Sequence, residues 1–366
     1  MDKVKKSGNM RYWVSYRVNG KQRLEYSGTD FEQAKAGDGK RSCQKAEGRI
    51  LDILQSSKIT FRQLSDWYYT QVAITRLKSF KRLKIGIENF NAVLGDNIVS
   101  DITKDDLAIY QEKRKNDFVR SGAQRKEGNR RVSPSTVDME ISIVKTMVNY
   151  AFLEDKISGT SLKAFIRTKK QVRTGSNART RTFNNIEFAA IMKNAKKHVC
   201  DFMIIAINTG MRLGEIRQLK WENIDNDMRF IRLDSSDTKE KKSKVIPINQ
   251  NVKCVLERQL RWIHHNFVLT WGGNPIISIE GIKGGFINAA NKAGILYGRD
   301  SGGIIFHDIR RTVKTLMTRA GIEKAHRDKI LGHSQQGMDR HYIVVSDQDI
   351  ESAMKKYSQV IDSGIW

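Results

Sequence analysis

The chain has 366 residues, of which 65 are Lys or Arg and 40 are Asp or Glu, giving a formal net charge of +25. Hydrophobic residues make up 39% of the chain, which is enough for packed cores and excludes a wholly disordered protein. The longest apolar run, 202–207, is too short to span a membrane, and the N-terminus lacks the apolar stretch of a secretory signal. Three scattered cysteines favour neither a disulfide scaffold nor a cysteine zinc site. We therefore expect a soluble, cytoplasmic protein of two or three domains with a polyanionic partner.

Residues 1–57 are predicted to form a β-hairpin followed by a helix-leaning segment. Apolar and polar residues alternate from Tyr12 to Val18, and Asn19-Gly20 supplies the pair that a type I′ turn favours. Residues 21–27 follow as the return strand. The stretch 30–53 is polar and helical in character, although three glycines weaken it.

Residues 58–162 are predicted to form a small domain of four helices. Capping boxes at Thr60 and Thr103 open two of them. Ser133-Pro134 opens another, because proline is favoured at the first helical position. An apolar stripe with helical spacing at 80–94 supplies the remaining helix.

A basic linker is predicted at 163–182, which contains seven Lys and Arg residues and no acidic residue. Because a neutral linker would separate domains equally well, this charge favours a segment that follows a phosphate backbone. A merely solvated tether is the alternative. The stretch 113–131, with 8 basic and 2 acidic residues, is likewise too polar for a core. The candidate DNA contacts in these two stretches are Arg130, Arg131, Lys169, Lys170, Arg173, Arg179 and Arg181.

The largest domain is predicted at 183–345, followed by a tail at 346–366. The apolar run 202–207 predicts a buried helix, and two short strands at 229–233 and 244–248 flank a lysine-rich loop. Further helices are expected at 250–264, 281–293, 307–319 and 323–331. The expected fold class is a multidomain protein, mainly α with small β elements, that ends in a mixed α/β domain.

Four phrases of this last domain point to a chemistry. They are 209–224 (TGMRLGEIRQLKWENI), 237–248 (DTKEKKSKVIPI), 307–322 (HDIRRTVKTLMTRAGI) and 331–342 (LGHSQQGMDRHY). In these words and in this order they resemble the catalytic domain of tyrosine recombinases, the phage integrase family. The upstream segments match only in order and shape, as an arm-binding-like domain at 1–57 and a core-binding domain at 58–162.

The resemblance implies a covalent mechanism. Exchanging DNA strands without losing phosphodiester energy requires a covalent enzyme intermediate, and a tyrosine phenoxide is a suitable nucleophile. Two arginines can each fork onto non-bridging phosphate oxygens, as lysine cannot. The family's catalytic residues fall on Arg212, Lys239, His307, Arg310, His333 and the nucleophile Tyr342.

The supporting roles follow from the same resemblance. Lys239 would protonate the departing 5′-oxygen, His307 would assist proton transfer at the nucleophile, and His333 would hydrogen-bond a phosphate oxygen. Glu215 lies three residues after Arg212, on the same helical face, and would orient the arginines.

Several residues compete for these roles or suggest other chemistry. Lys239 has rivals in Lys241, Lys242 and Lys244, whereas Tyr357 sits 24 residues after His333, against nine for Tyr342. His264-His265 is not a metal pair, since adjacent helical positions face different directions. No phosphate-binding glycine loop and no acidic cluster of a two-metal nuclease occurs in the sequence, so we expect no cofactor and no metal.

The expected function is site-specific recombination that integrates or excises a phage or a genomic island. The resemblance implies a homotetramer on double-stranded DNA with core and arm sites, near the nucleoid, helped by a DNA-bending host factor and an excision factor. Ile350, Met354 and Tyr357 have helical spacing, so the tail is expected to pack in trans on a neighbouring protomer. Two alternatives are a type IB topoisomerase-like enzyme and a non-catalytic DNA-binding protein of the same fold.

Overall fold

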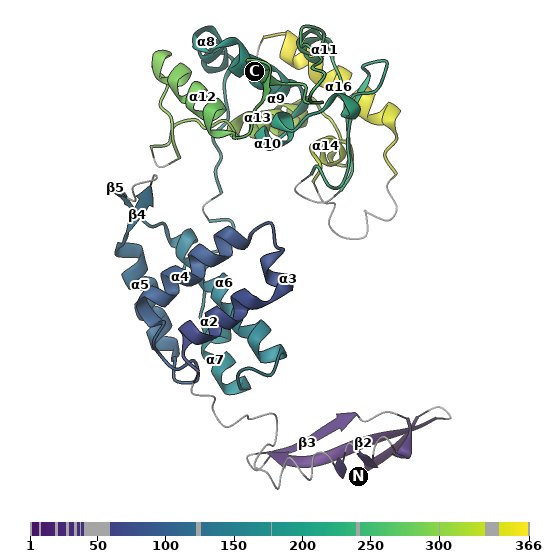
Figure 1. Cartoon of the computed structure of the whole chain (residues 1–366). Helices are drawn as coiled ribbons and strands as arrows, with labels where there is room; N and C mark the ends of the chain where they lie inside the picture. The colour runs from purple at the N-terminus through teal and green to yellow at the C-terminus, as the bar shows by residue number, and fades with distance from the viewer. Residues whose placement is uncertain are drawn as a thin grey trace. The chain divides into compact units, whose positions relative to one another are not determined.

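The structure is a computed structural model of the chain (Figure 1). It describes residues 2–6, 9–18, 21–26, 29–32, 35–36, 38–39, 59–121, 126–176, 178–238, 242–299, 301–333 and 344–364. The chain divides into two compact units, Met1–Ala178 and Arg179–Trp366. Both units are mainly helical with small sheets, as the sequence predicts. Within the described ranges, no helix is long and apolar enough to cross a membrane.

The N-terminal sheet has three antiparallel strands, β1 (Asp2–Lys6), β2 (Asn9–Val18) and β3 (Lys21–Tyr26), in that order. Val18 pairs with Lys21, as a two-residue connection requires, so the predicted hairpin is confirmed. The pattern did not predict β1, because its lysines leave no apolar alternation. The helix expected at 30–53 lies largely outside the described residues.

The helical domain is built from six helices and one hairpin in the part of the chain described at 59–167. They are α2 (Phe61–Thr70), α3 (Val72–Thr75), α4 (Phe80–Leu94), α5 (Lys104–Asn116), β4 (Phe118–Ser121), β5 (Lys126–Arg131), α6 (Pro134–Leu153) and α7 (Gly159–Arg167). The capping boxes at Thr60 and Thr103 are both formed, and Pro134 is the first residue of α6. Fully buried side chains such as Ile87, Phe90 and Val144 make its core.

The predicted linker begins later than the sequence indicated. Helix α7 takes up the first residues of 163–182 and buries Phe165 completely in the helical core. The chain after α7 also stays attached, because the Asp138 carboxylate accepts the backbone N–H groups of Gln171 and Val172, both at 2.9 Å. The tether is therefore shorter than composition alone suggested.

The second unit contains the elements of the predicted catalytic domain. They are α8 (Asn185–Asn194), α9 (Lys197–Thr209), α10 (Leu213–Arg217), η1 (Trp221–Asn223), β6 (Phe230–Leu233), β7 (Lys244–Pro247), α11 (Gln250–Glu257), β8 (Thr270–Trp271), β9 (Asn274–Pro275), α12 (Glu280–Lys292), α13 (Asp308–Arg319), α14 (Lys324–Leu331) and α16 (Asp347–Asp362). Helix α9 contains the buried run 202–207, as predicted. Strands β6 and β7 pair antiparallel, so the two predicted strands are also confirmed.

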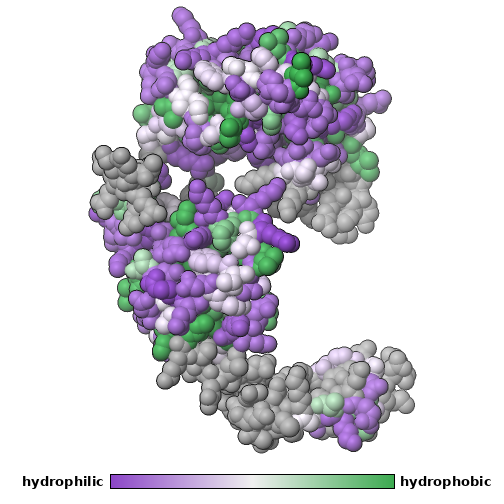
Figure 2. Space-filling model, in the orientation of Figure 1, coloured by the Kyte–Doolittle hydropathy of each residue, from purple (hydrophilic) through white to green (hydrophobic). Residues whose placement is uncertain are grey.

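Apolar side chains form separate cores in the two units, whereas hydrophilic side chains predominate on the face shown in Figure 2. In the second unit, α10, α11, α12 and α13 all contact α9. This arrangement brings the end of α9, the start of α10 and the first turn of α13 together, although they lie up to about a hundred residues apart in the sequence.

The C-terminal helix packs within its own chain in this structure, whereas packing in trans on a neighbouring protomer stays a prediction. Helix α16 packs on α14, α13 and β7 of its own chain. Ile350, Met354 and Tyr357 are buried in the same core as α9, and the Tyr357 hydroxyl donates to the Ile207 carbonyl at 2.6 Å. The helical spacing correctly predicted an apolar face, but such a pattern does not indicate which copy of the chain that face covers.

Candidate active site

The site begins where α9 ends. Gly210 closes the helix in the left-handed conformation, with φ of 66°, and a Cβ there would lie 2.4 Å from Leu331 Cδ2. The chain then turns so that Arg212 caps α10. The Arg212 backbone N–H donates to Glu215 Oε2 at 3.0 Å, and Nη1 of its side chain donates to Oε1 at 2.7 Å. The three-residue spacing thus holds Arg212, the N-cap residue of α10, against Glu215.

Glu215 has a second cationic partner, Lys244, at the start of β7. Lys244 Nζ lies 3.1 Å from Glu215 Oε2, and both side chains are almost completely buried. Burial alone would raise the pKa of Glu215, but the Lys244 charge and the hydrogen bonds from Arg212 outweigh it and lower that pKa to about 2. Glu215 is therefore ionised and ties the hairpin strand to the arginine.

Burial makes the Lys244 side chain a weaker base. Burial lowers the pKa of Lys244 to about 8; Glu215 opposes this, while Arg310 and Arg212 add to it. The residue therefore remains mainly protonated at neutral pH and contributes a positive charge beside both arginines.

Arg310, from the first turns of α13, is buried with its guanidinium aimed at backbone carbonyls. Nη1 donates to the Gly210 carbonyl at 2.6 Å, and Nη2 donates to the Leu331 carbonyl. Nη2 also lies 3.0 Å from His333 Nε2. A single side chain thus joins three of the four phrases found in the sequence.

Each residue of the Leu-Gly-His phrase (331–333) packs against or contacts a residue of this site. Leu331 is completely buried against Gly210, and Gly332 adopts φ of 68° with space for a Cβ limited by Lys244 Cδ at 3.2 Å. His333 Nδ1 lies 3.4 Å from the Asp328 carboxylate. Because Arg310 can only donate, Nε2 of His333 is the acceptor, which assigns its proton to Nδ1.

Both site histidines favour the neutral form. Burial lowers the pKa of His333, and the Arg310 and Lys314 charges lower it further. Burial also lowers the pKa of His307, with Arg310, Arg311 and Arg212 acting in the same direction. A neutral imidazole at the start of α13 is able to accept a proton near neutral pH.

The structure brings together four of the predicted site residues, Arg212, Glu215, Arg310 and His333, through Lys244 and backbone carbonyls. His307 lies at the N-terminus of the same α13 that carries Arg310. Lys239 and Tyr342 lie outside the described residues, so their roles stay predictions.

The predicted DNA contacts fall into two groups. Arg130, Lys169, Lys170 and Arg173 are exposed on the first unit, as is Arg131, whose Nη1 donates to Asn116 Oδ1 at 2.7 Å. Arg179 and Arg181 are instead half-buried in ion pairs, with Asp308 and Glu187 respectively. Assigning any of them to DNA binding stays a prediction.

Sequence reasoning missed two charged residues of this region. Lys244 was considered only as a rival general acid, although its place at the edge of an apolar strand was a signal of burial. Asp308 is completely buried, yet it resembled an ordinary acidic residue in the first turn of a helix. Among the described residues, no group of three or more His, Cys, Asp or Glu side chains is arranged to hold a metal ion.

Comparisons with known proteins agree with this geometry. Residues 181–349 match the model of the phage integrase family. The shufflon-specific DNA recombinase of Escherichia coli is 23% identical over 191 residues, covering 52% of this chain and 45% of that protein. The prophage integrase IntR of Escherichia coli strain K12 is 23% identical over 236 residues, covering 63% and 52%. The chain thus spans about half the length of the curated relatives it matches.

The fold is also found among solved structures. A lambda integrase tetramer bound to a Holliday junction aligns with a TM-score of 0.59 at 17% identity, over 92% of this chain and 93% of that one. At this identity the likeness concerns the fold. The family model spans all four phrases, and described residues of these phrases converge on one cationic site, so residues 181–349 are similar to the phage integrase family.

Proposed function

We propose that the chain is a site-specific DNA recombinase that cuts and rejoins strands through a covalent 3′-phosphotyrosyl intermediate. The observation that carries this proposal is the cationic cluster of Arg212, Lys244 and Arg310. Arg212 and Lys244 share the Glu215 carboxylate, and Arg310 is held by the Gly210 and Leu331 carbonyls. Fixed donors of this kind stabilise the charge that develops on a phosphorane.

In the proposed reaction, Tyr342 Oη attacks the scissile phosphorus and its proton passes to His307. The bond from phosphorus to the 5′-oxygen breaks, and Lys239 supplies the proton that makes this leaving group a 5′-hydroxyl. Arg212 and Arg310 neutralise the non-bridging oxygens. Attack of a 5′-hydroxyl from another strand on the phosphotyrosine reverses these steps and releases the tyrosine, so no phosphodiester energy is lost.

The proposed partners are DNA, further copies of the chain and accessory proteins. The net charge of +25 and the exposed cations of the first unit support binding to double-stranded DNA. The lambda integrase solved as a tetramer on a Holliday junction supports a homotetramer. By their order in the chain, 1–57 are assigned to arm sites and 58–162 to the core site. A DNA-bending host factor, an excision factor and a nucleoid location complete the proposal. The biological outcome is integration or excision of a phage or a genomic island.

The test is a cleavage assay on a nicked core site taken from the flanks of the element, run in EDTA and read on a denaturing gel. We expect wild-type protein to form a slowly migrating protein–DNA adduct and Tyr342→Phe to form none. Tight binding without an adduct would favour the inert DNA-binding alternative. Relaxation of supercoiled DNA that lacks the site would favour the topoisomerase alternative.

A further inference from the structure

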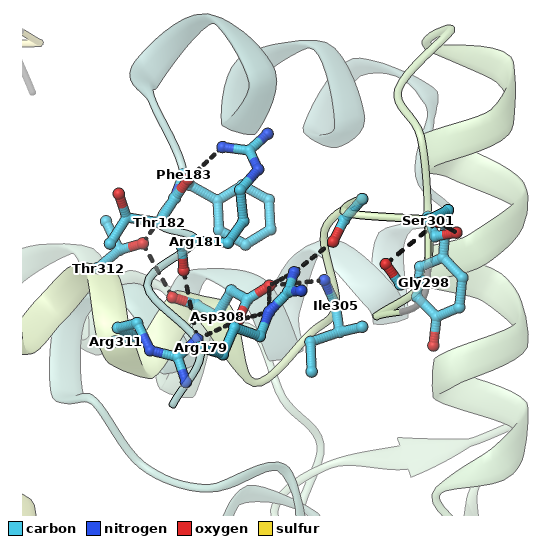
Figure 3. Close-up of polar contacts among 12 residues, drawn as sticks. Arg179, Arg181, Thr182, Phe183, Gly298, Ser301, Ile305, Asp308, Arg311 and Thr312 are labelled. Carbon is cyan, nitrogen blue, oxygen red and sulfur yellow. Dashed lines mark hydrogen bonds and ion pairs between the residues drawn. The ribbon is translucent and has the colours of Figure 1, made fainter. Parts of the chain in front are cut away.

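Asp308 directly follows His307. Its hydrogen-bond and ion-pair partners are unusual for an acidic residue in the first turn of a helix (Figure 3). Its side chain is completely buried. Arg179 Nε donates to both of its oxygens, at 2.9 and 3.1 Å, and Arg179 Nη2 donates to Oδ2 at 2.6 Å. Arg311 Nη1 approaches Oδ1 at 2.5 Å. The carboxylate is thus enclosed and accepts hydrogen bonds from both Nε and Nη2 of an arginine 129 residues away in the sequence.

The same pair also fixes the loop that leads into His307. The Ile305 backbone N–H donates to Asp308 Oδ2 at 2.9 Å, and Arg179 Nη2 donates to the Gly303 carbonyl. Gly303 packs closely against the neighbouring backbone, because a Cβ there would lie 2.2 Å from the Leu296 carbonyl oxygen. Arg179 and Asp308 therefore hold the backbone on both sides of His307.

Arg179 belongs to a short strap, residues 179–183, that follows the first turns of α13. The Arg181 carbonyl accepts from Arg311 Nη1 at 3.3 Å. The Phe183 N–H donates to Thr312 Oγ1 at 2.8 Å, and Phe183 itself is buried in the core. The strap is held at one end by the buried side chain of Phe183 and at the other end by the hydrogen bonds from Arg179 to Asp308.

We propose that Arg179 is a positioning residue for DNA cleavage, which acts through Asp308 to hold His307 and Arg310 at the start of α13. This inference rests on the proposed function. His307 precedes the clamped carboxylate by one residue and Arg310 follows it by two, so a shift of this turn displaces both. A phosphate contact is the competing role for Arg179, but its side chain is only 15% exposed and its guanidinium donates to Asp308 and the Gly303 carbonyl.

The chain offers a matched control in Arg258, whose guanidinium pairs with the buried Asp201 carboxylate in the same unit. Arg258 follows α11, which carries none of the predicted catalytic residues. Arg179→Gln and Arg258→Gln therefore remove the same charge and each break one pair with a buried carboxylate. Only the first alters the backbone around His307.

The experiment uses the full chain and compares wild type, Arg179→Gln, Arg258→Gln, Asp308→Asn and the Arg179→Gln/Asp308→Asn double variant. It measures the Kd for a core-site duplex, the single-turnover cleavage rate at saturating protein, and thermal unfolding. We expect Arg179→Gln to cleave about 10- to 100-fold more slowly, the cost typical of misplaced groups, with a Kd shift no larger than that of Arg258→Gln. The double variant is expected to be no slower than the slower single variant, because both changes break one interaction.

A wild-type cleavage rate in folded Arg179→Gln would overturn the inference, as would a loss of activity explained entirely by Kd. If Arg179→Gln does not fold, Asp308→Asn decides by the same criteria, because it keeps the shape of the carboxylate while removing its charge. Arg179→Lys separates positioning from a general loss of stability. We expect it to cleave faster than Arg179→Gln but more slowly than wild type, since lysine restores the charge but not the two-pronged hydrogen bonding of the guanidinium. Absence of an adduct with wild-type protein would overturn the proposed function itself. If wild-type protein forms the adduct and Arg179→Gln cleaves at the same rate, only this inference is overturned.

Discussion

At the scale of single residues, Lys244 lies in surroundings that a lysine rarely occupies, because its ammonium group is buried. A buried ammonium is costly unless a counter-charge satisfies it, and Glu215 supplies that counter-charge. Glu215 in turn accepts from the backbone and side chain of Arg212. The lysine is therefore connected to Arg212 through one shared carboxylate.

Replacing Lys244 by Met should expose this connection. The variant keeps the aliphatic stem but leaves the buried Glu215 with Arg212 as its remaining charged partner, so we expect a loss of about 3–5 kcal/mol in stability. Single-turnover cleavage should fall about 10- to 100-fold with little change in DNA affinity, because Arg212 is less well held. Lys193→Met, at an exposed position of α8, is the control for charge. Wild-type cleavage by Lys244→Met would contradict the proposed connection.

The surroundings of His333, which include Arg310, predict how the stability of the protein depends on pH. His333 has a lower pKa in the folded protein, through burial and then Arg310, than the value of about 6.5 expected when unfolded. The unfolded chain therefore binds the proton more readily, and stability must fall as the pH drops below about 6.5. His307 shifts in the same direction, so His333→Gln should reduce this slope without abolishing it.

The measurement is the free energy of unfolding of the second unit by denaturant, at a series of pH values on either side of about 6.5. The exposed His264→Gln is the control. An identical slope in wild type and His333→Gln would contradict the neutral assignment of His333.

At the scale of elements, the helices were the most predictable part of the chain. Capping boxes at Thr60 and Thr103 mark true helix starts, because the caps satisfy local backbone groups whatever the tertiary context. Strand β1 and the β4–β5 hairpin gave no such signal, since their polar sequences carry no alternation. Partners distant in sequence, such as Arg179 and Asp308, leave no local signal either.

Helix α16 gives a test of packing within one chain. Tyr357 is completely buried and donates to the Ile207 carbonyl, so Tyr357→Ala should cost about 3–5 kcal/mol. If the helix packs on its own chain, this loss appears in dilute, DNA-free protein and does not depend on protein concentration. Lys355→Ala, on the exposed face of the same helix, is the control. Unchanged stability of dilute Tyr357→Ala would favour packing in trans instead.

At the scale of the whole molecule, the four phrases indicated which distant segments meet at the candidate site. Arg212, Glu215, Arg310 and His333 converge as the resemblance implies, because the fold brings the ends of α9, α13 and α14 together. The roles of Lys244 and Asp308 could not be predicted, since burial of a charge depends on which distant group neutralises it. Cis or trans packing of the tail is likewise not determined by an amphipathic pattern.

The most direct test of the account is to locate the covalent bond to DNA. Trypsin separates the two tyrosines of the C-terminal region, placing Tyr342 in the peptide His341–Lys355 and Tyr357 in Tyr357–Trp366. After cleavage of a nicked core site and digestion with nuclease and trypsin, mass spectrometry should find the nucleotide on His341–Lys355. A nucleotide on Tyr357–Trp366, whose tyrosine is completely buried, or tight binding with no modified peptide would contradict the account.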